Sequence, residues 1–192
     1  MTIKVIALCG SGRRHSLNRK LLEISAQGAR EAGGEITFIS SADYQLPIYE
    51  GDVEYTHGVP ESVRDLQRLF EEHTALLVAS PEHNGGFSAS LKNAIDWISR
   101  PLANGKPGIP LISTKVAAVV SASPGPMGGV RSMLGMRGVL EKLGAIVIPQ
   151  GFSLGNAHLA FTETGRLVDD KADVEARLVG YRLVEVTRQL SR

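Results

Sequence analysis

The residues best suited to do chemistry in this 192-residue chain lie in two loops, each of which follows an apolar run. Residues 75–79 read Ala-Leu-Leu-Val-Ala, and Ser-Pro-Glu-His-Asn-Gly-Gly-Phe follows at 80–87. In an open parallel sheet, ligands bind beyond the carboxyl ends of the strands, where such loops lie. Gly85 and Gly86 have no side chain, so their backbone N–H groups can approach a flat ligand closely. We therefore predict that the 80–87 loop holds a planar ligand.

The second loop, residues 10–18, reads Gly-Ser-Gly-Arg-Arg-His-Ser-Leu-Asn and follows the apolar run at 3–9. Apolar residues recur at helical spacing after Ser16, a favourable N-cap residue, which predicts a helix start there. A strand, a polar turn and a helix N-terminus together bind phosphate through free amides and the helix dipole. Five side chains of this loop can add donors or positive charge: Ser11, Arg13, Arg14, Ser16 and Asn18. The two loops together predict a ligand with a phosphate group and a flat head.

The elements that must position these loops alternate along the chain. Strands are predicted near residues 3–9, 35–40, 75–80, 115–121 and 145–149. Helices are predicted near residues 16–32, 60–72, 87–99, 128–143 and 169–190. Such alternation gives right-handed βαβ units and a parallel sheet with helices on both faces. Five strands favour a flavodoxin-like, three-layer α/β sandwich with strand order 2-1-3-4-5 over the six-stranded Rossmann order.

Length, charge and composition argue against several classes of protein. A chain of this length is expected to form one domain, residues 1–192. A net charge of +1 without a dense basic cluster argues against a nucleic-acid partner, and no apolar run approaches the roughly 20 residues of a membrane span. The histidines show no metal-ligand spacing, so no metal site is predicted. With one cysteine and a first strand predicted from residue 3, we expect neither a disulfide framework nor a signal peptide, and hence a cytoplasmic protein.

Two segments are too long to be simple connections. Residues 41–59 contain three tyrosines, and residues 100–113 are rich in proline and glycine. Loops of this length are commonly functional or pack against a partner subunit.

Three motifs, taken in order, carry a resemblance to a known family. Residues 10–18 fit the pattern G-S-x-R-x-x-S-x-N, and residues 81–84, Pro-Glu-His-Asn, are followed by Leu-Lys-Asn-Ala-Ile-Asp-Trp at 91–97. A third loop at 121–129 reads Ser-Ala-Ser-Pro-Gly-Pro-Met-Gly-Gly. With these motifs the chain resembles the NADPH-dependent FMN reductases, a flavodoxin-like group that includes quinone, azo-dye and chromate reductases.

The resemblance implies a set of FMN-binding residues. The phosphate ligands it implies are Ser11, Arg13, Ser16 and Asn18, with help from the Leu17 amide. The residues implied to line the isoalloxazine and ribityl chain are Pro81, Glu82, His83, Asn84, Gly85 and Gly86, with Ser121 or Ser123 bordering the flavin from the fourth strand. The chain departs from the family at two places. His83 stands where a tyrosine is common, and Gly85-Gly86-Phe87 stands where a tyrosine and a proline often follow.

The activity implied by the resemblance needs little from the side chains, because the cofactor carries the chemistry. NADPH or NADH gives a hydride to flavin N5, and the reduced flavin then passes electrons to a second substrate in a ping-pong cycle. Acceptors of the family are quinone-like, azo, metal-oxyanion or free-flavin molecules. No catalytic acid–base residue is predicted. The family also implies a homodimer or homotetramer with the flavin near the subunit boundary.

Other functions remain to be weighed against this one. A flavodoxin-type electron carrier would be expected to be acidic, whereas this chain is nearly neutral. A flavin-binding sensor without NAD(P)H turnover would keep every FMN contact and stays open. Residues 151–155 match the G-x-S-x-G pattern of hydrolases, but no helix is predicted to start there. The catalytic triad of such hydrolases also needs an acid and then a histidine after the serine, and the last histidine of this chain is His158. A hydrolase is therefore not expected.

Overall fold

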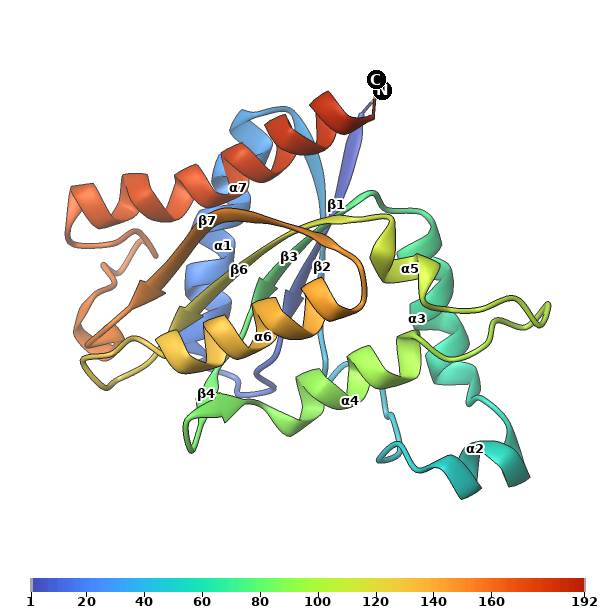
Figure 1. The fold of residues 1–192 in the computed structure, drawn as a ribbon. Helices are drawn as coiled ribbons and strands as arrows, with labels where there is room; N and C mark the ends of the chain where they lie inside the picture. Colours follow the sequence, from blue (N-terminus) through green and yellow to red (C-terminus); the bar gives the residue numbers. More distant parts are fainter. Residues whose placement is uncertain (1, 192) are drawn as a thin grey trace.

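The computed structural model, which describes residues 2–191, contains a five-stranded parallel sheet with helices on both faces (Figure 1). The strand order is β2-β1-β3-β6-β7. The strands span Ile3–Cys9 (β1), Gly34–Ser40 (β2), Ala75–Ala79 (β3), Val116–Ala122 (β6) and Ile146–Leu154 (β7). Counted without the short hairpin β4–β5, this is the predicted order 2-1-3-4-5, and the predicted flavodoxin-like α/β fold is confirmed.

The helices cover the two faces of this sheet unequally. They span Leu17–Glu31 (α1), Gly51–His57 (α2), Glu61–Glu71 (α3), Ala89–Ile98 (α4), Pro110–Ser113 (α5), Val130–Lys142 (α6) and Asp170–Leu190 (α7). Helices α1 and α7 pack on one face, while α3, α4, α5 and α6 pack on the other (Figure 1). None of the helices within residues 2–191 is long and apolar enough to cross a bilayer.

Strand side chains alternate between two hydrophobic clusters, because successive residues of a strand point to opposite faces. In β3, Ala75, Leu77 and Ala79 join the cluster under α1 and α7, and Leu76 and Val78 join the opposite cluster. All of β3 is buried. Burial on both faces explains why the central strands read as continuous apolar runs.

The last strand is longer than its predicted range of 145–149. β7 continues to Leu154, and its register against β6 shifts between Ala117 and Val119. The prediction stopped at Pro149, which has no N–H to donate. β7 lies at the edge of the sheet, where an irregularity can accommodate a proline. The G-x-S-x-G match at 151–155 therefore begins within a strand.

The segments predicted as long connections contain small elements of their own. Helix α2 lies within 41–59, helix α5 lies within 100–113, and the 80–87 loop contains a two-stranded hairpin of β4 (Glu82–His83) and β5 (Gly86–Phe87). The hairpin lies at the end of the sheet where β1, β3 and β6 terminate (Figure 1). This end also carries the 10–18 and 121–129 loops.

Candidate functional site

The 10–18 loop presents a row of free backbone donors. Ser16 is the N-cap of α1, and its Oγ accepts a hydrogen bond from the Arg19 amide at 3.1 Å. The backbone N–H groups of residues 14–18 donate to no other group within residues 2–191. Consecutive free amides at the start of a helix form a site for an anion, because the dipole and the hydrogen bonds act together.

Asn18 joins this loop to the end of strand β6. Its side-chain amide donates to the Ala122 carbonyl at 2.8 Å, and its Oδ1 accepts from the Ala122 amide at 3.0 Å. Both residues are buried. The predicted phosphate ligand Asn18 therefore already holds two backbone hydrogen bonds, which leaves one N–H of its side chain for a ligand.

A cavity of about 130 Å³ opens between the three loops. Nine of the predicted site residues line it: Ser11, Arg13, Ser16, Leu17, Asn18, Pro81, Glu82, His83 and Ser123. Two further lining residues, Ala122 and Pro124, were missed by the sequence analysis. Ala122 ends the buried strand, and only its pairing with Asn18 marks it as part of the site.

The other four predicted residues do not line this cavity. Asn84 and Gly85 form the turn of the β4–β5 hairpin, with φ of 51° and 82°. Two-residue hairpin turns of this kind need positive φ at both positions, which Asn-Gly supplies, so this dipeptide was a usable signal for the hairpin. Gly86 pairs with His83 in the hairpin. Ser121 is buried, and its hydroxyl donates to the Ser80 carbonyl at 2.7 Å.

The hairpin is fastened to helix α6 by an ion pair. The Glu82 carboxylate accepts two hydrogen bonds from the Arg131 guanidinium, at 3.0 and 2.5 Å, and a longer one from the Ser132 amide at 3.4 Å. The Arg131 guanidinium holds the pKa of Glu82 below its usual value. Since its carboxylate is occupied in this way, Glu82 keeps the hairpin in place beside the cavity.

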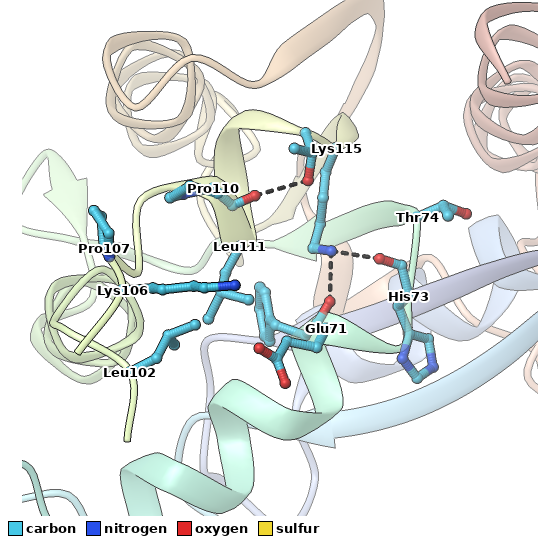
Figure 2. A pocket seen from close by; sticks show the side chains of 11 residues that line it. Glu71, His73, Thr74, Leu102, Lys106, Pro107, Pro110, Leu111 and Lys115 are labelled. Carbon is cyan, nitrogen blue, oxygen red and sulfur yellow. Dashed lines mark hydrogen bonds between the residues drawn. The ribbon is translucent and has the colours of Figure 1, made fainter. Parts of the chain in front are cut away.

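A larger cavity, of about 470 Å³, lies at the opposite end of β6, around Lys115 (Figure 2). Lys115 is only 2% exposed, and its Nζ donates to the carbonyls of Phe70 and His73 at 2.7 and 2.5 Å. Phe70 lies in the last turn of α3 and His73 just beyond it, where the backbone carbonyls have no intrahelical N–H four residues on to accept from. Burial lowers the pKa of Lys115 to about 8. We assign Lys115 a structural role in completing the end of α3.

The donor set of the 10–18 loop matches the phosphate group of the predicted cofactor. It combines the free amides with the hydroxyls of Ser11 and Ser16 and the guanidinium of Arg13. The amides, hydroxyls and guanidinium are all strong hydrogen-bond donors to a phosphate. A carboxylate in the same cavity would repel the phosphate unless it were paired with a positive charge. The one carboxylate lining the cavity, that of Glu82, is paired with Arg131. The residues present therefore fit the phosphate end of FMN.

Comparison with known proteins finds similarity over most of the chain, and the similar proteins belong to the family that the sequence motifs predicted. The family model of the NADPH-dependent FMN reductases matches residues 3–159. An NAD(P)H:quinone oxidoreductase of Solanum tuberosum is 36% identical over 182 residues, which cover 92% of this chain and 89% of that protein. An NAD(P)H-dependent FMN reductase of Pseudomonas aeruginosa is 36% identical over 171 residues, which cover 88% and 87%.

A solved structure is also similar over nearly its whole length. The flavoenzyme NAD(P)H:(acceptor) oxidoreductase FerB of Paracoccus denitrificans matches with a TM-score of 0.80 and 27% identity, covering 98% of each chain. The family model, which matches residues 3–159, spans all three motifs on which the predicted resemblance rests. On this agreement, the protein belongs to the NADPH-dependent FMN reductase family, a family of enzymes.

Proposed function

We propose that this protein is an FMN-dependent NAD(P)H oxidoreductase that reduces a small electron-poor acceptor, with a quinone as the first candidate. The observation that carries the proposal is the run of free amides at residues 16–18, which lines one cavity together with Arg13 and Pro81 to His83. Membership of the family and the quinone oxidoreductase of Solanum tuberosum support the choice of acceptor.

In this proposal the chain binds and orients, and it carries out no proton transfer of its own. FMN, when bound, supplies the redox chemistry by accepting a hydride and passing on electrons. The phosphate is held by the side chains of Ser11, Arg13 and Ser16 and by the amides of residues 16–18. Asn18 keeps the β6 end, and with it Ser123, at a fixed distance from these donors.

The volume of the cavity limits which part of FMN it can enclose, and therefore where the nicotinamide and the acceptor bind. The cavity, of about 130 Å³, is smaller than the roughly 300–1,000 Å³ of a pocket that encloses a whole ligand. We propose that it takes the phosphate and ribityl end of FMN, and that the flat ring lies along the β4–β5 hairpin. In that arrangement one exposed face near His83 serves the nicotinamide and the acceptor in turn, which gives a ping-pong order. The four predicted residues that do not line the cavity act by shaping the hairpin and the strand ends: Asn84, Gly85, Gly86 and Ser121.

A second copy of the chain is proposed to complete this exposed side. Ile48 and Tyr55 are 85% and 93% exposed on the segment that leads into and forms α2. Ile48 lines a cavity together with the first turn of α4. The segment is held firmly, because Asn93 and Trp97 both donate to the Pro47 carbonyl. Trp97 itself is buried, so it anchors the proposed contact surface without being part of it. Light scattering that finds a monomer at micromolar concentration would contradict this part of the proposal.

The function is tested by the visible spectrum of the purified protein, reconstituted with FMN, before and after anaerobic addition of NADPH or NADH. A yellow protein that bleaches within seconds and turns yellow again with a quinone is the expected result. A yellow protein that stays yellow with both nucleotides would favour a carrier or a sensor. A protein that does not retain FMN would overturn the proposal.

A further inference from the structure

A second polar cavity lies on the other side of the 10–18 loop, at the carboxyl end of β2. It has a volume of about 250 Å³, and we call it the β2-end cavity. Its polar lining residues are Ser11, Arg13, Arg14, Arg19, Ser40 and Asp43. Ser11 and Arg13 also line the proposed FMN cavity, so the two sites are neighbours. We propose that the β2-end cavity binds the 2′-phosphate on the adenosine of NADPH, an inference that rests on the proposed function.

The charges around this cavity favour an anion. Arg13 and Arg14 form no ion pair with any residue within 2–191. Arg19 is paired with Glu23 at 3.0 Å and lies over the Phe38 ring, with its guanidinium carbon 4.8 Å from the ring centre. The cavity is thus lined by two guanidinium groups without an ion-pair partner, by Arg19 paired with Glu23, and by one carboxylate, that of Asp43. Guanidinium groups bind a phosphate monoester in a bidentate manner, which makes them the natural partners of a 2′-phosphate.

The cavity is built from segments that are already fixed. The Ser41 amide donates to the Cys9 carbonyl at 2.9 Å, and a Cβ on Gly12 would lie 2.7 Å from that of Ala42. The Asp43 carboxylate accepts from the Ser40 amide at 2.6 Å. The walls therefore need little reordering when a ligand binds, which lowers the entropic cost of binding.

The position and chemistry suit the adenosine end of a dinucleotide better than a second flavin. The FMN phosphate is already assigned to the free amides of residues 16–18, which line the other cavity. In other nucleotide-binding sheets, the end of the second strand carries either a carboxylate that binds the ribose 2′-hydroxyl of NADH or a nearby arginine that accommodates the 2′-phosphate of NADPH. Here the Asp43 carboxylate is engaged by the Ser40 amide, and Arg14 is the arginine in position to take the 2′-phosphate. Arg14 is the critical residue, because it lines only the β2-end cavity and occupies a variable position of the G-S-x-R-x-x-S-x-N pattern.

The test is calorimetric titration of the FMN-loaded protein with 2′-AMP, 5′-AMP and inorganic phosphate, in the wild type and in Arg14→Gln. Lys142→Gln is the matched control, because it removes one positive charge from an exposed position of α6. We expect 2′-AMP to bind most tightly and Arg14→Gln to weaken it about tenfold. In steady-state kinetics, Arg14→Gln should raise KM for NADPH about tenfold and leave KM for NADH unchanged. Lys142→Gln should alter neither.

Three outcomes would overturn the inference. They are equal affinity for 2′-AMP and 5′-AMP, affinity for inorganic phosphate equal to that for 2′-AMP, and KM values for NADPH and NADH that change by the same factor in Arg14→Gln. Failure of the proposed function is recognised separately. In that case, neither nucleotide bleaches the bound FMN, and the titration with 2′-AMP still reports the preference of the cavity.

Discussion

At the scale of single residues, Asn18 illustrates how a side chain can serve a binding site by holding backbone in place. Its two hydrogen bonds to Ala122 join residues 104 positions apart. Asn18→Ala leaves the buried Ala122 amide and carbonyl without partners, so we expect the free energy of unfolding to fall by about 3 kcal/mol. Urea denaturation measures this, with the exposed Asn104→Ala as the control. Unchanged stability together with lost FMN affinity would show that Asn18 acts as a phosphate ligand instead.

Lys115 gives a prediction about pH. Burial lowers its pKa from 10.5 to about 8, so between these values the unfolded chain binds more protons than the folded protein. Stability must then rise with pH across this window, by about 3 kcal/mol in total for this group. We expect the free energy of unfolding of the wild type, minus that of Lys115→Met, to increase from pH 8 towards pH 10.5.

Urea titrations at several pH values measure this difference directly. The lost hydrogen bonds to Phe70 and His73 shift it by a constant amount, because backbone carbonyls do not titrate in this range. Lys142→Met, which removes a lysine from an exposed position, is the control. A flat or falling difference for Lys115→Met would contradict the prediction.

At the scale of elements, the β4–β5 hairpin depends on its turn. Gly85 has a φ of 82°, which costs an alanine about 1 kcal/mol or more. A Cβ on Gly86 would meet only the His83 carbonyl, at an ordinary 3.8 Å. We expect Gly85→Ala to lower the free energy of unfolding by about 1 kcal/mol and to weaken FMN binding, with Gly86→Ala near the wild type. If FMN titration shows Gly86→Ala to be the damaging change, close approach of the backbone to the flavin is the better explanation.

The crossing of α1 and α7 depends on two glycines that face each other's helix. A Cβ on Gly28 would lie 1.9 Å from the Arg177 carbonyl oxygen, and one on Gly180 would lie 1.8 Å from that of Ser25. Gly180→Ala must push the helices apart, and we expect a loss of about 3 kcal/mol or more in the free energy of unfolding. Gly138→Ala in α6, where nothing lies within 4 Å, should instead stabilise the protein by about 0.5–1 kcal/mol. Similar stabilities for the two variants in urea denaturation would contradict this account.

At the scale of the whole molecule, the fold gathers its polar loops at one end of an otherwise apolar sheet. We propose that residues 1–192 unfold as one domain and that the phosphate site is the main anchor of FMN. Excess FMN, at 100 times its Kd, should then stabilise the single unfolding transition by about 2.7 kcal/mol. Riboflavin, which lacks the phosphate, should raise the midpoint in scanning calorimetry far less. Equal shifts with the two flavins would contradict the proposed anchoring.

The sequence by itself determined the sheet, its strand order and the loops that carry the site. These features follow from short-range patterns: apolar runs for strands that are buried on both faces, helical spacing after Ser16, and polar turns at strand ends. Nine of the predicted FMN residues were brought to one cavity because the carboxyl ends of parallel strands share one edge.

Only the tertiary structure decided which groups are free to bind a ligand. Asn18 is engaged by Ala122, Glu82 by Arg131, and Ser121 by Ser80, and each pair is distant in sequence. The continuation of β7 past Pro149 likewise depends on its place at the sheet edge. The β2-end cavity exists because the 10–18 loop packs against the end of β2. Local periodicity carries no information on such long-range pairings, since they arise only when the folded chain brings separate loops together.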